Sequence, residues 1–178
     1  MFSVFPSDEQ QRAAKSLVQR HNIGQRGKAD GSQQEQYYGM LGQICLCDML
    51  RFKRPTGSEG FDGGVDFIIN NIKVDLKTMH RTVDVKDHYV HNFIGYQMEY
   101  PCQFYIFASY NIKTNKLTLC GIISKKDFLK KASFYEKGAI RTRDDGTSFA
   151  SKAPLYEIKQ EDLIQIKNKQ DMLEKVRI

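Results

Sequence analysis

Two carboxylates and a lysine on a predicted β-hairpin are the residues of this sequence best placed to do chemistry. Asp66 lies in one short apolar run, Asp75 and Lys77 lie in the next, and Asn70 and Asn71 separate the runs. Two asparagines favour a two-residue turn, because asparagine tolerates positive φ better than most residues. We therefore predict a hairpin with strands over 65–69 and 72–78.

The turn also predicts which residues face each other. Ile69 pairs with Ile72, Phe67 with Val74, and Val65 with Leu76, so that one side of the hairpin is entirely apolar. On the other side Asp66 lies across from Asp75, and Lys77 follows two residues later. Directly opposed like charges destabilise a sheet, so we expect a positive group between them. Lys77 is one candidate and a hard divalent cation is another; a solvated face on which acid and base happen to cluster is the structural alternative.

This arrangement resembles the catalytic signature of the PD-(D/E)xK nuclease superfamily. The resemblance rests on Val65-Asp66 and, nine positions after Asp66, on Asp75-Leu76-Lys77, with Val65 in place of the nominal proline. It implies an α/β (α+β) fold with a restriction-endonuclease-like core, a mixed central β-sheet flanked by helices. It also implies Mg²⁺-dependent hydrolysis of phosphodiester bonds in DNA, with Mn²⁺ as a substitute cation.

Members of this superfamily often supply a further glutamate from a helix before the hairpin. The segment Gly39-Met40-Leu41-Gly42-Gln43 resembles the form in which that glutamate would stand at Gln43. At 100° per residue, Glu35 shares a helix face with both glycines, and Gln43 lies further round. Either Glu35 or Gln43 is therefore expected near the metal, with Glu35 slightly favoured, and an exposed Glu35 at the helix N-terminus is the structural alternative.

The resemblance also assigns roles to the hairpin residues. Asp66, Asp75 and the Leu76 carbonyl would bind the metal, together with Glu35 or Gln43. Lys77 would orient or activate the attacking water and stabilise the charge that develops on the phosphate.

Basic residues after the hairpin are the candidates for gripping phosphates. These candidate nucleic-acid contacts are His80, Arg81, Lys86, His88, His91, Arg141 and Arg143. For each one taken singly, a solvated surface position is the competing interpretation.

The elements around the hairpin follow from apolar periodicity and capping residues. We predict helices over 8–20, capped by Ser7, and over 32–50. Strands follow at 103–110 and 117–123, and a helix capped by Ser124 is expected to end near Gly138. A basic loop at 141–143, a strand at 155–159 and a C-terminal helix complete the prediction, while 81–100 is ambiguous.

Length, net charge and cysteine spacing predict the number of domains, the kind of partner and the state of the thiols. One domain is expected over 1–178, because a single core serves a chain of this size. The 27 basic and 21 acidic residues give a net charge of +6, which suggests a polyanionic partner such as nucleic acid, with a solvated basic surface as the competing interpretation. The resemblance implies that this partner is DNA. The four cysteines lack zinc-site spacing and are expected to be reduced and buried.

The sequence also gives expectations for cellular location and for oligomeric assembly. No apolar run approaches a membrane span and the start of the chain lacks a secretory signal pattern, so an intracellular, cytoplasmic protein without a membrane partner is expected. Cutting both strands of DNA often requires two active sites, so a homodimer is one expected assembly. The function from a different class that stays open is a nucleic-acid-binding protein with this fold and little or no activity.

Overall fold

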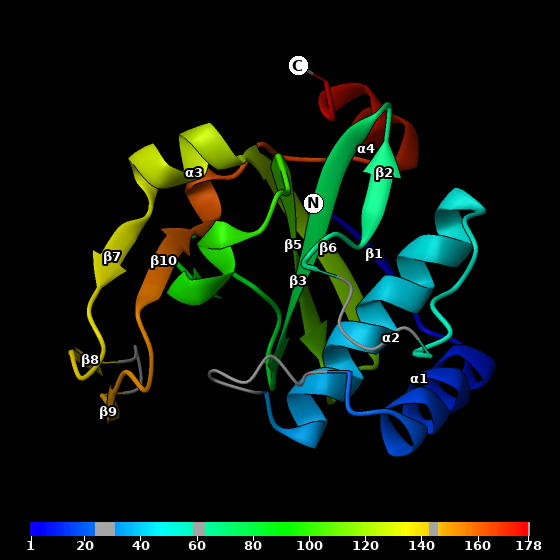
Figure 1. The fold of residues 1–178 in the computed structure, drawn as a ribbon, viewed down its shortest axis with the longest axis horizontal. Helices are drawn as coiled ribbons and strands as arrows, with labels where there is room; N and C mark the ends of the chain where they lie inside the picture. The colour runs from blue at the N-terminus through cyan, green and yellow to red at the C-terminus, as the bar shows by residue number, and fades with distance from the viewer. Residues whose placement is uncertain (24–30, 59–62, 143–145, 178) are drawn as a thin grey trace.

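A curled five-stranded sheet divides the protein into two sides (Figure 1). The computed structural model describes residues 1–23, 31–58, 63–142 and 146–177. Two helices, α1 and α2, cover one face of the sheet, and a second, three-stranded sheet with a short helix lies beyond the other face. The mixed α/β class with a mixed sheet flanked by helices is therefore confirmed.

The central sheet has the strand order β1-β6-β5-β3-β2. Its strands are β1 (Phe2–Val4), β2 (Phe67–Ile69), β3 (Ile72–Arg81), β5 (Phe104–Asn111) and β6 (Lys116–Ser124). Strands β3 and β5 run parallel over eight residue pairs, and every other neighbour is antiparallel. All eight residues of β5 are buried, as expected for the central strand of a sheet that is covered on both faces.

Helices α1 (Asp8–Arg20) and α2 (Gln33–Leu50) begin at the predicted caps. Ser7 and Ser32 each form a capping box, in which the serine side chain and the third helical residue satisfy each other's backbone groups. Gly42 lets α2 approach the sheet, because a Cβ at this position would collide with the Thr78 side chain of β3. The even-numbered residues of β3 therefore face α2.

The opposite face of the sheet packs against a separate aromatic cluster. Strands β4 (Val90–Ile94), β10 (Leu155–Lys159) and β7 (Ser133–Tyr135) form the smaller sheet. They enclose, with α3 (Lys125–Lys131), a core rich in aromatic side chains. Its largest fully buried members are Tyr105, Phe93, Phe107 and Phe128.

The structure corrects several predicted boundaries. Helix α3 ends at Lys131 rather than near Gly138, because the residues that follow pair with β10 as strand β7. The ambiguous segment contains β4 and a 3-10 helix, η1 (Gly95–Glu99). Arg141 of the expected basic loop lies instead in strand β8 (Ile140–Thr142), which pairs with β9 (Ser148–Ala150).

The C-terminal elements close one end of the central sheet. A 3-10 helix, η2 (Gln160–Asp162), follows β10, and α4 (Lys169–Lys175) lies beside the hairpin turn (Figure 1). The Asn70 side chain donates hydrogen bonds to the carbonyls of Leu173 and Val176, at 3.0 and 3.1 Å. The turn asparagine thereby anchors the end of α4.

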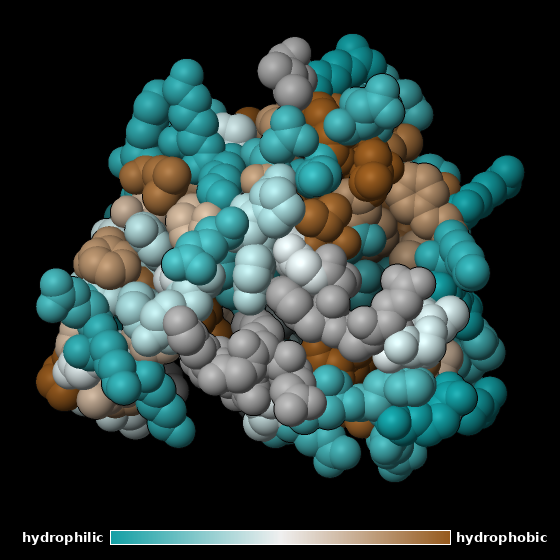
Figure 2. Space-filling model, in the orientation of Figure 1, coloured by the Kyte–Doolittle hydropathy of each residue, from teal (hydrophilic) through white to brown (hydrophobic). Residues whose placement is uncertain are grey.

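Polar side chains cover most of the face seen in Figure 2, and apolar side chains gather at its upper right, in the region of β2 and α4. Ile68 of the edge strand β2 is 62% exposed. Among the described residues, no helix is long and apolar enough to cross a membrane. All four cysteines are free and buried, as predicted.

Candidate metal and phosphodiester site

The hairpin forms with the predicted register between Phe67 and Val74, whereas the predicted Val65–Leu76 pair lies beyond the end of the strand ladder. Asn70 and Asn71 have φ values of 52° and 63°, as a two-residue turn of the primed type requires. Phe67 pairs with Val74, and Ile69 pairs with Ile72. The apolar side is buried at Phe67, Ile69, Ile72, Val74 and Leu76.

Asp66 enters this hairpin differently from the prediction. The strand ladder ends at Phe67, and the Asp66 N–H donates to the Val74 carbonyl at 3.1 Å. Its carboxylate Oδ2 accepts a hydrogen bond from the Leu76 N–H at 2.7 Å. Asp66 is therefore displaced from a position directly across from Asp75, and its carboxylate lies against the peptide group that joins Asp75 to Leu76.

Asp75 and Lys77 form an ion pair in a mostly buried setting. Lys77 Nζ lies 2.6 Å from Asp75 Oδ2, and the two side chains are 21% and 3% exposed. The Lys77 ammonium also lies 5.5 Å from the centre of the Phe93 ring, a cation–π distance. Sequence reasoning gave no signal for Phe93 as a neighbour of the site, because the contact depends on how the smaller sheet docks.

Tyr105 is the second neighbour that the sequence did not indicate. It pairs with Asp75 across the parallel β3–β5 ladder. Burial raises the pKa of the Tyr105 phenol, and the negative charge of Asp75 adds to this shift. The site therefore combines a carboxylate with a phenol that stays protonated, in surroundings where an unpaired charge is costly.

The backbone of Leu76 also contributes to the site. In a strand the N–H and C=O of one residue point towards the same neighbouring strand. The Leu76 N–H points to the Asp66 carboxylate, so the Leu76 carbonyl is directed to that side as well. Carboxylate and carbonyl oxygens are the donors that Mg²⁺ prefers.

Glu35 lies apart from these groups. Its carboxylate accepts hydrogen bonds from the Ser32 N–H at 2.7 Å and from the Ser32 hydroxyl at 2.8 Å, which completes the α2 capping box. Within the described residues, no three His, Cys, Asp or Glu side chains group closely enough to hold a metal ion. The structure therefore does not bring Glu35 together with Asp66 and Asp75.

Gln43 is the second helix candidate. It is half-buried and precedes Cys47 by four residues, so the two share a face of α2. Burial raises the pKa of the Cys47 thiol to about 11, with smaller contributions from the charges of Asp48 and Asp66. Gln43 therefore lies on the helix that packs against the Leu76 and Thr78 side of β3, whereas Lys77 faces Phe93 on the other side of the sheet.

The candidate phosphate-binding residues fall into different environments. His80 is exposed and stacks on Tyr38, with ring centres 4.7 Å apart. Arg81 donates to the Val90 carbonyl at 2.6 Å and lies 5.0 Å from the Tyr89 ring. Lys86 and His88 are exposed and lie near the same ring, so three basic side chains gather around Tyr89.

Two of the remaining candidates have structural partners. His91 is only 1% exposed and its Nε2 lies 2.8 Å from Gln160 Oε1, so its assignment as a phosphate contact is wrong. Arg141 pairs with the buried Glu157 at 2.7 Å and lies 3.8 Å from the Tyr135 ring. Arg143 lies outside the described residues.

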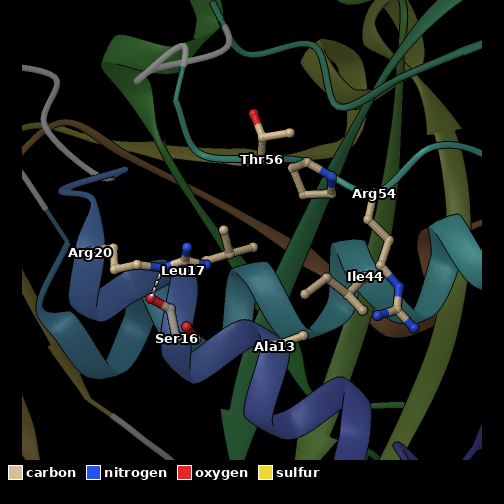
Figure 3. Close-up of a pocket in the computed structure, with 8 residues that line it drawn as sticks. Ala13, Ser16, Leu17, Arg20, Ile44, Arg54 and Thr56 are labelled. Atoms are coloured by element: carbon tan, nitrogen blue, oxygen red, sulfur yellow. Dashed lines mark hydrogen bonds between the residues drawn. The ribbon is translucent and has the colours of Figure 1, made fainter.

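A shallow hollow of about 400 Å³ lies away from this site, between α1, α2 and residues 54–56 (Figure 3). Its floor is apolar, with Leu17 and Ile44, and two arginines line it. Arg54 is bound to Glu9 and Asp48 at 2.6 Å each, and the Arg20 Nε donates to the Ser16 carbonyl at 3.2 Å. Both arginines serve to tie local structure together.

Comparison with known proteins found no matching family model, no curated protein with significant sequence similarity and no solved structure with significant similarity.

Proposed function

We propose that this protein is a metal-dependent endonuclease that hydrolyses phosphodiester bonds in DNA, built on a restriction-endonuclease-like core. The observation that carries the proposal is the hydrogen bond from the Leu76 N–H to the Asp66 carboxylate. It holds one carboxylate beside the segment that carries the Asp75–Lys77 ion pair. Two acidic groups, a backbone carbonyl and a lysine at this end of the hairpin are thus the groups that we assign to the site.

These donors fit a magnesium ion. Mg²⁺ commonly binds one or two carboxylates and completes its shell with waters and substrate phosphate oxygens, so a third acidic ligand is not essential. Asp66, Asp75 and the Leu76 carbonyl would hold the ion, with Gln43 as the remaining helix candidate. When bound, such an ion lowers the pKa of water and neutralises charge on the scissile phosphate.

The protein's own side chains would position the ion and stabilise the charge that develops in the transition state. Asp66, fixed by the Leu76 N–H, provides an oxygen donor that needs little reorganisation on binding. Lys77 supplies positive charge where the phosphate gains negative charge in the transition state. The apolar and aromatic neighbours limit water around the pair and so strengthen these electrostatic interactions.

Nicking of supercoiled plasmid with Mg²⁺, Mn²⁺ or a chelator tests the proposal. Wild-type protein is expected to nick or cut the plasmid only with a divalent cation. Asp66→Asn, Asp75→Asn and Lys77→Ala are each expected to lower the rate at least ~100-fold, since each removes a group that stabilises charge in the transition state. Lys73→Ala is the matched control, because Lys73 is an exposed lysine on the same strand.

Equal nicking by all four variants would contradict the proposal and indicate another site or a contaminant. The alternative is a nucleic-acid-binding protein without cleavage. It is favoured by Glu35, whose carboxylate is engaged in the α2 cap. DNA or RNA retention in a mobility-shift assay, without cleavage of either under any cation, would support that alternative.

A further inference from the structure

Lys77 is paired with the Asp75 carboxylate, the group proposed to bind a divalent cation. The ammonium lies 2.6 Å from Asp75 Oδ2, well within direct contact. The carboxylate is 3% exposed, and its surroundings include the Tyr105 and Phe93 rings. In such surroundings an unpaired carboxylate is costly, so the ionised form of Asp75 is stabilised by a cation beside it.

We propose that Lys77 is a built-in competitor of the metal: it neutralises Asp75 in the metal-free protein and is displaced when a divalent cation binds. The inference rests on the proposed function only in assuming that Asp66 and Asp75 share a cation. Two carboxylates with one ammonium leave a net negative charge, and a divalent cation in its place makes the site neutral. The exchange is therefore electrostatically balanced.

Displacement would also place the lysine where its charge is useful. The Lys77 side chain is 21% exposed against 3% for Asp75, so solvent reaches the ion pair from the Lys77 side. A flexible four-carbon stem lets the released ammonium turn towards that side, where a phosphate would approach. Metal binding thus both fills the site and frees the group that grips the substrate.

Competition between Lys77 and the metal predicts that one substitution, Lys77→Met, has opposite effects on metal binding and on cleavage. Lys77→Met keeps most of the apolar stem and removes the ammonium, so it is expected to bind Mg²⁺ at least tenfold more tightly while losing cleavage activity. Without metal the variant is expected to be less stable than the wild type, because Asp75 is left uncompensated. Added MgCl₂ should therefore raise its melting temperature more than that of the wild type.

Thermal denaturation over a MgCl₂ series, at constant ionic strength, measures this difference without using activity. Lys73→Met is the matched control and should respond to Mg²⁺ like the wild type. Lys77→Met/Asp75→Asn should lose the enhanced response, which assigns it to Asp75; this double variant also folds without an uncompensated charge. Lys77→Arg, which keeps the ion pair, should respond like the wild type.

A Lys77→Met response to Mg²⁺ no larger than that of the wild type would overturn the inference. So would an enhanced response that persists in the double variant. Should no nuclease activity be found for the wild type, an enhanced, Asp75-dependent Mg²⁺ response would still support the competition. The proposed nuclease activity and the proposed competition between Lys77 and the metal can therefore be refuted independently.

Discussion

His91 is a buried histidine whose tautomer is determined by its hydrogen bonds and whose charge state is determined by its burial. Gln160 donates from its amide nitrogen to the Cys120 carbonyl at 2.9 Å, so its oxygen accepts from the His91 Nε2–H. That assignment leaves Nδ1 as the unprotonated nitrogen, and it has no hydrogen-bond partner in the described structure. Burial, together with the nearby charge of Arg81, lowers the pKa of His91 to about 4 despite the opposing hydrogen bond.

We predict that His91 makes the fold sensitive to acid. Its folded pKa lies below the unfolded value near 6.5, so the unfolded state binds the extra proton as pH falls. The stabilisation is complete above about pH 6.5 and declines as pH falls towards 4, by roughly 2–3 kcal/mol in total. Urea unfolding at pH 7 and pH 4.5 should show a smaller loss for His91→Gln than for the wild type.

An exposed histidine provides the control for this experiment. His88→Gln should keep the wild-type difference between the two pH values, because His88 is exposed in the folded state. If His91→Gln loses as much stability on acidification as the wild type, the buried histidine is not the source of the effect.

At the scale of elements, the hairpin was predictable because its determinants are local. Two asparagines select the turn, and the alternation of apolar residues selects the register. The entry of Asp66 was not predictable in the same way. Gly63 and Gly64 precede it with φ values of 69° and 75°, and a Cβ on Gly64 would collide with the Tyr100 ring. This contact joins two segments that are distant in sequence.

Helix α2 shows the same contrast between features that follow from local sequence and features that depend on tertiary packing. Its caps and length follow from local residues, whereas the side of the sheet that it covers depends on tertiary packing. The two glycines of α2 are alike in sequence and differ in the structure: Gly42 meets Thr78, and nothing lies within 4 Å of a Cβ built on Gly39.

We predict opposite signs for the same substitution at these glycines. Gly39→Ala should raise the free energy of unfolding by about 0.5–1 kcal/mol, because alanine favours the helix. Gly42→Ala should lower it by about 1–3 kcal/mol, because the new methyl group overpacks the interface with β3. Chemical denaturation of both variants measures the difference.

The double variant Gly42→Ala/Thr78→Ala tests the stated cause. It removes the side chain that the new methyl group meets, so it should be more stable than expected from the two single changes. A Gly42→Ala protein as stable as Gly39→Ala would show that α2 does not depend on this close approach.

At the scale of the whole molecule, the central sheet separates two environments for the candidate site. Leu76 and Thr78 face α2, while Asp75 and Lys77 face the aromatic cluster beneath the smaller sheet. The fold class and the hairpin follow from sequence patterns. The packing of Phe93 against Lys77 and the remoteness of Glu35 follow only from how distant segments assemble.

The net charge of +6 agrees with the proposed nuclease function. An excess of basic residues attracts a polyanion, and an acidic centre within a basic protein is what a metal-dependent nuclease requires. Three of the basic side chains gather around Tyr89, beyond the end of β3 that follows Lys77. The proposed nuclease function therefore depends on whether Asp66 and Asp75 share a cation.

Anomalous diffraction from crystals of the wild-type protein soaked in Mn²⁺ tests that claim most directly. A manganese peak is expected within about 2.5 Å of both carboxylates, with the Lys77 ammonium turned away from Asp75. An ordered hairpin with no peak at this position at saturating Mn²⁺, and with Lys77 still paired to Asp75, would contradict it.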